Sequence, residues 1–435
     1  MSGAEKTVAS LLAAAAVVSY EDLPVPVVED CRWSLLDLLA SCAAGPDPVF
    51  WELTTSEGAL MRNAFRGHAV DFDPVHPRSH GHPAAMLFPA LLPYYTSGAC
   101  TGRDLITAYA VGHEVMCAFG DVAGRALRDA GRHPTCVLGA IGVVAAVGRL
   151  FGLGSDDLER AVFLAALTTT GHSAGFGSAA KPYQLAVAAR NGHTAAVAVN
   201  DRTVGSIDVA GSIWGVLADP SSFREEDVPA FGAPWRVVDA PTFHKPLPIC
   251  GYLITTVLGF QRLLCDHALA PSSIASLEVR VPWSVAAVCR PGVPRTAHEA
   301  RFALGFQLAV CLTRPIEGFE SEVGALSRDP DIARLASAAE ITHDPTCDDD
   351  GSTLITVHLR GGDAVRLEVP VTGAGLALGG ELVVNGKWRR YLEDRFPDGA
   401  AARLAAATRD LENVAGPEWA GMLANLIPAA ATEKE

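Results

Sequence analysis

The sequence lacks the patterns that mark several classes of protein. Its ten cysteines lie far apart and form no Cys-x-x-Cys pair, which argues against the common zinc and redox motifs. Basic residues are few: 34 Lys and Arg stand against 49 Asp and Glu, the formal net charge is −15, and no basic stripe carries interleaved aromatics. Nucleic acid is therefore not expected as a partner. Buried, reduced thiols in a cytoplasmic protein are the simplest interpretation of the cysteines.

The sequence also lacks an internal repeat and any low-complexity segment beyond alanine-rich stretches. Its N-terminal apolar run, residues 8–20, is too short to cross a bilayer, and Glu5 offsets Lys6, so we expect a buried first helix and no membrane partner. What the chain does have is 435 residues, 49% of them hydrophobic and 19% charged. This composition predicts a globular protein of two or three domains.

Apolar residues recur at helical spacing through the first half of the chain. The expected helices cover residues 8–20, 26–44, 101–128, 134–152, 155–170 and 184–199. A proline-rich stretch at 218–248 then predicts a linker to a second domain.

The second half mixes two periodicities. Residues 277–281 alternate as a half-buried strand, and residues 355–359 and 365–369 flank Gly361-Gly362 as a hairpin. Helical spacing returns at 296–313, 329–339 and 387–427. We therefore predict a mainly α protein: a large all-helical domain over residues 1–243, completed by 385–435, and a smaller α+β lid domain over 244–384.

Residues 68–89 are the most informative stretch, because they bring four imidazoles and two carboxylates close together in sequence. These are His68, His76, His80, His82, Asp71 and Asp73. Four prolines in the same stretch predict that it is mostly loop, and titratable groups held on a loop by a rigid scaffold commonly form a functional site. The alternative is a solvated, histidine-rich surface turn.

Three further blocks carry candidate residues. Pro134 suits the first turn of a helix and leaves His133 near its N-cap, where the helix favours an anion and opposes protonation of the imidazole. Lys181 ends a glycine-rich loop, and Lys245 lies at the proposed domain junction, where ligands often bind. Taken singly, His133 is equally consistent with a simple cap of its helix, and each lysine is more typical of a solvated surface residue.

The ordered set of blocks resembles the MmgE/PrpD family, which includes 2-methylcitrate dehydratase and cis-aconitate decarboxylase. The set begins with Asp71-Phe-Asp73 and His82-Pro83 and continues with His133-Pro-Thr135, Lys181-Pro-Tyr183 and Lys245-Pro-Leu-Pro-Ile-Cys250. It extends to Leu36-Asp37, Gly112-His-Glu114, Arg280-Val-Pro282, His298-Glu-Ala-Arg301-Phe302 and Asp329-Pro-Asp331-Ile332. The resemblance implies a homodimer with a cofactor-free active site between its domains, acting on small di- and tricarboxylates.

Carried across position by position, the resemblance implies a set of site residues. Its catalytic members are His82, His133, Asp71 and Lys181, and its substrate-binding members are Lys245, His80, Cys250, Gln184 and Val75. His82 is preferred to His80 as the family histidine because of its spacing to Pro89. The implied function is a lyase, either a dehydratase or a decarboxylase, in which lysines clamp carboxylates and histidines exchange protons. Asp71 would orient a histidine or a lysine.

Several positions depart from the family pattern. Pro74 and Val75 replace an Asp and a Thr, Gln184 replaces a histidine, and Cys250 fills a place that is histidine in decarboxylase-like members. A tyrosine of those members is missing near Ala286 and Ala287. A polar position turned apolar rejects a substrate group that once bonded there, so we expect a specialised relative acting on a less polar or differently substituted acid, as a lyase or an epimerase.

Three alternatives remain open from the sequence. One is a metal enzyme that uses His76, His80, His82 and either Asp71 or Asp73. The second is a non-catalytic protein that binds carboxylates or acts as a scaffold. The third is a helical protein whose histidines all serve structure.

Overall fold

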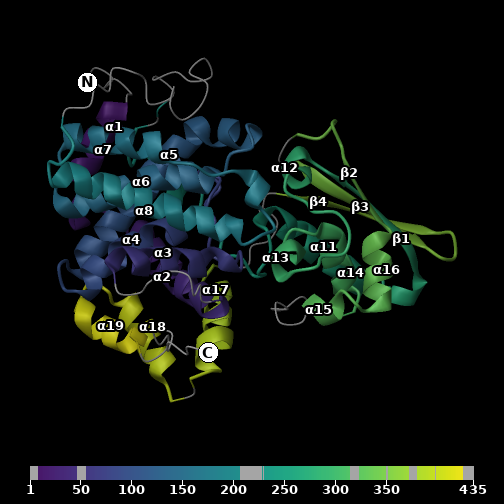
Figure 1. Ribbon diagram of the computed structural model, residues 1–435. Coiled ribbons are helices and arrows are strands. Elements are labelled where there is room, and N and C mark those ends of the chain that lie inside the picture. The colour runs from purple at the N-terminus through teal and green to yellow at the C-terminus, as the bar shows by residue number, and fades with distance from the viewer. Residues whose placement is uncertain are drawn as a thin grey trace.

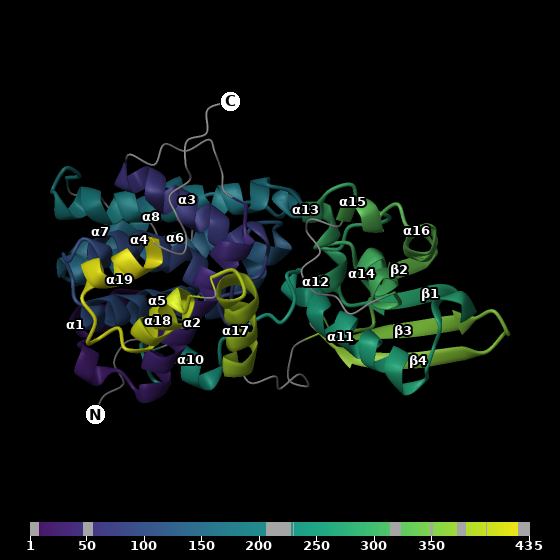
Figure 2. The same cartoon turned by 90° about the horizontal axis from the view of Figure 1, so that it is seen from below.

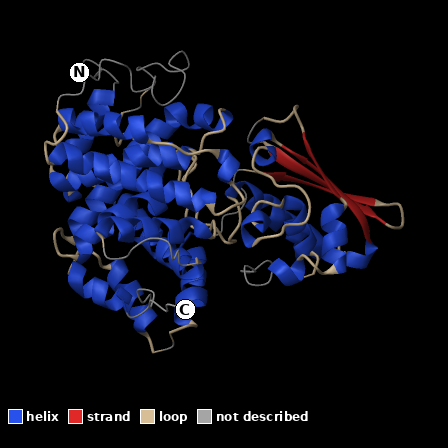
Figure 3. Cartoon of the chain, in the orientation of Figure 1, coloured by secondary structure: helices blue, strands red, loops and turns tan. Residues whose placement is uncertain are grey.

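The computed structural model describes residues 8–46, 55–205, 228, 230–313, 323–348, 351–371, 380–396 and 398–424. Helices predominate. Among the described residues a single small sheet is formed, and it lies at one end of the molecule (Figure 3). The expectation of a mainly α protein is confirmed. The domain boundaries at 243/244 and 384/385 stay predictions.

The first half forms a layered helical body. Its helices are α1 Val8–Val17, α2 Val25–Ala44, α3 Ser56–Ala69, α4 Pro83–Thr96, α5 Gly102–Asp129, α6 Pro134–Phe151, α7 Ser155–Thr168 and α8 Ala180–Asn200, with one-turn 3-10 helices at Tyr20–Asp22 and Ser173–Gly175. Helix α6 lies at the centre and packs against α4, α5, α7 and α8 (Figure 1). It is long and apolar enough to cross a membrane, but 83% of it is buried inside the protein, so its composition is explained by its place in the core.

Glycine allows the central helices to approach closely. A Cβ on Gly112 of α5 would lie 2.7 Å from the carbonyl oxygen of Gly142 on α6, so a side chain there would force the helices apart. This close crossing buries nearly every residue of α6 and gives a rigid base for His133 at its N-terminus.

The second half forms a separate hydrophobic core around a four-stranded sheet. Its elements are α11 Gly251–Asp266, a 3-10 turn Pro271–Ser273, β1 Ile274–Val281, α12 Trp283–Ala286, α13 Ala297–Ala300, α14 Leu304–Cys311, α15 Val323–Leu326, α16 Pro330–Ser337, β2 Ala339–His343, β3 Ser352–Leu359 and β4 Ala364–Pro370. The strand order is β2-β1-β3-β4, with β1 and β2 parallel and the other pairs antiparallel. The expected hairpin at Gly361-Gly362 is confirmed.

The last helices return to the helical body. They are α17 Gly380–Trp388, a π-helical turn Arg389–Glu393, α18 Ala400–Arg409 and α19 Gly416–Ala424. Helices α17 and α18 pack on α2, and α19 packs on α4, so the yellow C-terminal segment lies beside the purple N-terminal one (Figure 2). The short α10, Arg236–Asp239, also contacts α2 and α5.

Some expectations about elements were wrong. The stretch 68–89 is mostly loop, as expected, but the loop covers only residues 70–82, because Pro83 starts α4 at a position that needs no N–H donor, and Pro89 lies inside that helix. The helix expected at 329–339 ends at Ser337, and Ala339–His343 instead joins β1 as a parallel strand. The helix expected at 296–313 is broken between Ala300 and Leu304.

Of the expected linker, residues 218–227 and 229 lie outside the described residues. The described remainder contains α10 and an irregular segment that leads to α11. A backbone bridge between Val75 and Phe243 ties this segment to the loop that precedes α4.

Candidate active site

The centre of the candidate site is a buried carboxylate held between two ammonium groups. Asp71 Oδ1 lies 2.5 Å from Lys245 Nζ, and Asp71 Oδ2 lies 2.9 Å from Lys181 Nζ. Asp71 is 3% exposed, Lys181 6% and Lys245 0%. The three residues come from the loop after α3, the start of α8 and the segment before α11, so the fold brings together positions distant in sequence.

Local backbone geometry fixes this centre. Asp71 has a left-handed φ of +53°, which a non-glycine residue adopts only at a cost and which is typical of functional sites. Lys245 Nζ donates hydrogen bonds to the Asp71 carbonyl oxygen at 2.8 Å and the Ile249 carbonyl oxygen at 3.5 Å. Lys245 is therefore held by three acceptors, whereas Lys181 Nζ pairs with Asp71 Oδ2 and lies over the rings of Phe176 and Phe302.

A second carboxylate organises two histidines. His68 Nδ1 lies 3.0 Å and His82 Nδ1 lies 2.9 Å from the same oxygen of Asp73, although the His82 N–H is not well aligned for a hydrogen bond. His82 Nε2 faces the first carboxylate, 3.9 Å from Asp71 Oδ1. Because Asp73 attracts the Nδ1 proton, the unprotonated nitrogen of His82 is Nε2, which points toward Asp71 and the lysines.

His133 occupies the N-cap of α6, as the sequence predicts, and its tautomer is fixed by Gln184. The Gln184 side-chain oxygen accepts from the His172 N–H at 2.8 Å, so its amide nitrogen must be the atom 3.0 Å from His133 Nδ1. Cys136 Sγ lies 3.1 Å from the same ring nitrogen. With Nδ1 accepting, the proton of neutral His133 is on Nε2.

Burial and charge set the protonation states of the site. Burial would raise the pKa of Asp71, but the ammonium groups of Lys181 and Lys245 outweigh it and hold that pKa well below its ordinary value. Burial lowers the pKa of His82 to about 3, against the opposing effect of Asp73. Burial and Lys181 also keep the pKa of His133 well below its ordinary value, so both histidines are neutral near pH 7.

The sheet-containing half completes the surroundings of the site. Cys250 is the N-cap of α11, and burial and Asp71 raise its pKa to about 12, which keeps the thiol protonated. The ring of Phe176, in the helical body, is tilted by 30° against that of Phe302, in the other half, with ring centroids 5.8 Å apart. Burial and Arg301 lower the pKa of His298 to about 4, with Asp71 and Lys181 close enough to act on it. The cluster thus lies where the two halves meet.

Most of the residues predicted for the site come together. Asp71, His82, His133, Lys181, Lys245, Gln184 and Cys250 form the cluster described above. Val75 belongs to its edge, because the Val75 side chain and the Lys245 Cε both lie within 4 Å of where a Cβ on Gly251 would be. His80 differs: its ring packs against Gly124 of α5. The roles assigned to these residues stay predictions.

The residues considered as metal ligands from the sequence lie in two separate clusters. The set of His76, His80 and His82 with a carboxylate is not brought together: His82 joins His68 and Asp73, whereas His76 joins His113 and Cys117. Each group places its ligand atoms within 4.8 Å of one another. Within the active-site cluster, His68, Asp73 and His82 are therefore the residues that could hold an ion.

Sequence reasoning missed a network that supports the site from behind. Lys387 Nζ donates to Asp37 Oδ1 at 2.6 Å and to the carbonyl oxygen of Phe72 at 2.7 Å. The other Asp37 oxygen lies 2.6 Å from His244 Nδ1. Phe72 lies between Asp71 and Asp73, and His244 directly precedes Lys245. The network therefore fixes the backbone at the two carboxylates and at Lys245.

A signal for this network was present in the sequence. The chain has only five lysines, and its three internal ones are Lys181, Lys245 and Lys387, all less than a tenth exposed. A protein that uses arginine elsewhere and buries its internal lysines reserves them for a specific role. The scarcity of lysine is the part of this signal that the sequence alone provides.

A surface hollow of about 560 Å³ lies away from this cluster, between α2, α17 and α18. Trp33, Trp388, Glu381 and Arg409 are among its lining residues. It holds none of the histidines, lysines or carboxylates of the site. We therefore base the functional argument on the cluster.

The fold and the candidate site together describe one class of protein. Its chain is mainly helical with a small mixed sheet, and buried His, Lys and Asp residues lie where the two halves meet. The family profile described as MmgE/PrpD N-terminal domain matches residues 51–225, and that described as MmgE/PrpD C-terminal domain matches residues 247–413. The chain belongs to the MmgE/PrpD family, as its motifs predicted.

The curated relatives that match this chain include cis-aconitate decarboxylases. The chain is 28% identical to the Homo sapiens enzyme over 267 residues, which is 58% of this chain and 54% of that protein. It is 25% identical to the Aspergillus terreus enzyme over 397 residues, 79% of each chain. The match thus spans about half of the human protein.

Proposed function

We propose that this protein is a lyase that removes CO2 or water from a small di- or tricarboxylic acid, without a cofactor, by acid-base chemistry of histidine and lysine. The observation that carries the proposal is the convergence of Lys181, Lys245, His82 and His133 around Asp71. If the ion pairs of Asp71 served only to stabilise the fold, they would not require two histidines with fixed and different tautomers beside them. Such perturbed titratable groups in one cluster are typical of active sites.

The two lysines provide the binding step. Their ammonium groups share one carboxylate, Asp71, so a substrate carboxylate that enters between them meets a preorganised positive region and not two flexible surface chains. In this step Lys181 binds the substrate while Lys245, which is fully buried, holds Asp71. A bound anion also raises the pKa of each neighbouring histidine, which prepares these groups for proton transfer.

The two histidines have different roles. His82 presents an unprotonated Nε2 and has Asp73 to stabilise its imidazolium, so it is the group that takes up the proton and gives it back. His133 is neutral and carries its proton on Nε2, so it acts as an electrophile that donates a hydrogen bond to the oxygen on which negative charge develops. General acid-base catalysis of this kind contributes about 10²–10⁴ in rate.

The bond changes follow from these roles. In decarboxylation, the C–CO2⁻ bond breaks, its electron pair moves into the conjugated system as an enediolate of a remaining carboxylate, and the imidazolium of His82, formed once the bound anion has raised its pKa, gives the proton that closes the product. In dehydration, His82 removes the proton next to a carboxylate and, as imidazolium beside Asp73, gives it to the hydroxyl, which leaves as water. Lysine next to the developing enediolate stabilises its charge in both cases.

The names of the relatives favour decarboxylation, whereas Val75 and Cys250 favour a substrate that is less polar at one end. The test is to incubate the protein with a panel of small di- and tricarboxylates that includes cis-aconitate and 2-methylcitrate, and to follow CO2 release and product spectra. Turnover that is lost in His133→Gln and Lys181→Met supports the proposal. Turnover unchanged in both variants contradicts it.

Epimerisation is the second candidate function. It is favoured by the placement of His82 beside Asp71 Oδ1 and of Lys181 beside Asp71 Oδ2, because a base and an acid that flank one carbon can remove a proton and return it from the other side. Loss of optical activity without loss of CO2 or water would identify it.

A further inference from the structure

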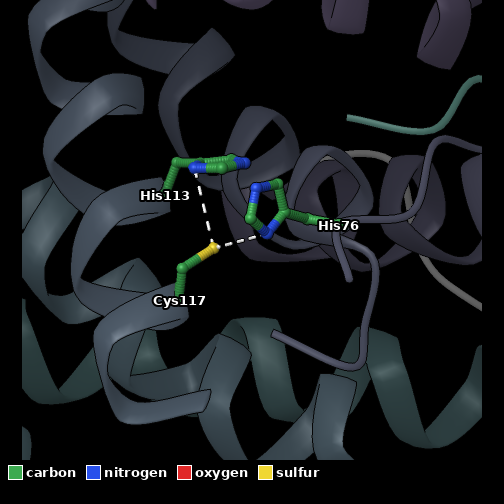
Figure 4. A group of neighbouring side chains, drawn as sticks. All are labelled: His76, His113 and Cys117. Carbon is green, nitrogen blue, oxygen red and sulfur yellow. Dashed lines mark hydrogen bonds between the residues drawn. The ribbon is translucent and has the colours of Figure 1, made fainter. Parts of the chain in front are cut away.

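A second group of buried ligand-type side chains lies outside the active-site cluster and has no part in the reaction proposed above. It consists of His76, His113 and Cys117, and all three are at most 3% exposed (Figure 4). His113 and Cys117 are four residues apart on α5 and so share one face of that helix. His76 reaches them from the loop that carries Asp71, Asp73 and His82.

We infer that His76, His113 and Cys117 form a structural site for one thiophilic d10 metal ion, Cu(I) or Zn(II). Thiolate and imidazole are the ligands that such ions prefer. The three residues come from two separate elements, as in metal sites that clip one segment to another.

The distances fit an ion at the centre of the group. Cys117 Sγ lies 3.1 Å from His76 Nδ1 and 3.7 Å from His113 Nδ1. Metal bonds of about 2.3 Å to sulfur and 2.0–2.1 Å to nitrogen place two such ligand atoms about 3.5 Å apart in a tetrahedral site. Figure 4 shows both rings turning a nitrogen toward the sulfur, and the rings lie nearly at right angles, with centroids 4.7 Å apart.

The surroundings of His76 also fit a ligand. The carbonyl oxygens of Arg236 and Ala240 lie near its ring and favour a ring proton, although His76 Nε2 makes no well-aligned hydrogen bond. That tautomer leaves the other nitrogen free to bind a metal, which is the usual arrangement of a metal-bound histidine. On binding, the Cys117 thiol gives up its proton to solvent and coordinates as thiolate.

The ion would hold the active-site loop in place. A Cβ on Gly120 would lie 2.2 Å from the Arg78 carbonyl oxygen, so this loop is pressed closely against α5 just beyond Cys117. The triad is fully enclosed, so no substrate reaches it and its role is structural. Three ligands complete a trigonal Cu(I) site, whereas Zn(II) requires a fourth donor, and in the described part of the chain the group contains only these three.

The test uses the full-length protein, expressed with added zinc or with added copper and purified under reducing conditions. Elemental analysis is expected to find about one ion per chain in one of the two arms, and X-ray absorption to find one sulfur and two nitrogen neighbours. Cys117→Ser and His113→Gln should each lower the metal content at least about tenfold. Cys31→Ser, at another fully buried helix cysteine, is the matched control and should keep the metal.

A second control separates the two candidate groups. Asp73→Asn disturbs the group of His68, Asp73 and His82, and it should leave the metal content unchanged. Absence of metal in both arms would overturn the inference and identify the triad as a hydrogen-bonded thiol only. Metal retained in Cys117→Ser, or an absorption spectrum without a sulfur neighbour, would overturn it as well. Because none of these readouts is an activity, the result does not depend on the proposed lyase function.

Discussion

Lys387 Nζ donates a hydrogen bond to the carbonyl oxygen of Phe72, 315 positions earlier in the chain. The bond holds in place the residue that lies between the two carboxylates of the candidate site, Asp71 and Asp73. The same ammonium group pairs with Asp37 and lies 4.0 Å from the centre of the Phe72 ring. Helix α17 therefore supports the loop that carries Asp71 and Asp73, although it contributes no group to the cluster around Asp71.

Replacing Lys387 with methionine should weaken the protein and slow the reaction together. The change leaves Asp37 buried with one partner fewer, and breaking a buried ion pair typically costs about 3–5 kcal/mol. Urea unfolding measures this loss, and kcat should fall while KM changes little, because Lys387 does not touch the substrate. In the double variant Lys387→Met with Asp37→Asn the charge is removed on both sides, and much of the stability should return. A KM effect larger than the kcat effect would contradict the positioning role.

The two site lysines should respond differently to substitution. Lys181→Met removes a cation from the binding step but leaves Asp71 paired with Lys245, so the protein should fold and KM should rise about 10-fold to 100-fold, as expected for loss of a charged hydrogen bond of about 1.5–3 kcal/mol. Lys245→Met leaves Asp71 without its fully buried partner and should destabilise the fold in addition. Steady-state kinetics and thermal melting separate the two outcomes. Equal melting temperatures for the two variants would be inconsistent with this assignment.

Gln184 should control the activity of His133 without touching the reaction centre. Gln184→Glu places an acceptor opposite His133 Nδ1, which moves the ring proton from Nε2 to Nδ1 and removes the Nε2–H donor. We expect kcat to fall about 100-fold with a small change in KM. Gln184→Leu removes the donor without reversing the tautomer and should cost less. Nitrogen NMR of the imidazole reports the tautomer directly, and an unchanged Nε2–H in Gln184→Glu would refute the prediction.

The sequence predicted the central helices closely. Residues 101–128 and 134–152 were expected, and α5 and α6 cover Gly102–Asp129 and Pro134–Phe151, because capping residues and a long apolar pattern define both ends. It did not predict β2, whose burial is mixed and which becomes a strand only because β1 offers it an edge. Helix α4 was hidden by its prolines, two of which lie within the helix itself.

The site was predictable to the extent that its residues lie in short motifs. Asp71, His82, His133, Lys181 and Lys245 were all selected, whereas His80 was placed in the substrate site although its ring packs on α5. A choice between two histidines two residues apart depends on loop geometry, here the left-handed backbone at His80, with φ of +47°. The Lys387 support was not foreseen because its contact with Asp37 spans 350 positions and involves no local pattern.

The buried histidines should make the protein less stable in mild acid. The pKa of His82 is about 3 in the folded protein and near 6.5 when unfolded, so between these values only the unfolded chain takes up the proton. The free energy of unfolding should therefore fall by about 1.4 kcal/mol between pH 7.5 and 5.5 for this group. Burial lowers the pKa of His68 and His133 as well, so these two act in the same direction.

Urea unfolding of His82→Gln at both pH values checks this assignment, and the difference between them should shrink. His267→Gln, at an exposed histidine, is the control and should leave the difference unchanged. A wild-type protein that is equally stable at pH 7.5 and 5.5 would contradict the burial of neutral imidazoles.

The most direct measurement of the central claim is proton NMR of cis-aconitate and related small carboxylic acids, incubated in D2O with the protein and, separately, with His133→Gln. The account predicts that at least one acid loses CO2 or water, or exchanges a carbon-bound proton for deuterium, and that His133→Gln slows this at least about 100-fold. If the wild-type protein neither converts nor deuterates any acid of the panel, or if the variant does so equally fast, the cluster around Asp71 is not the active site of a lyase.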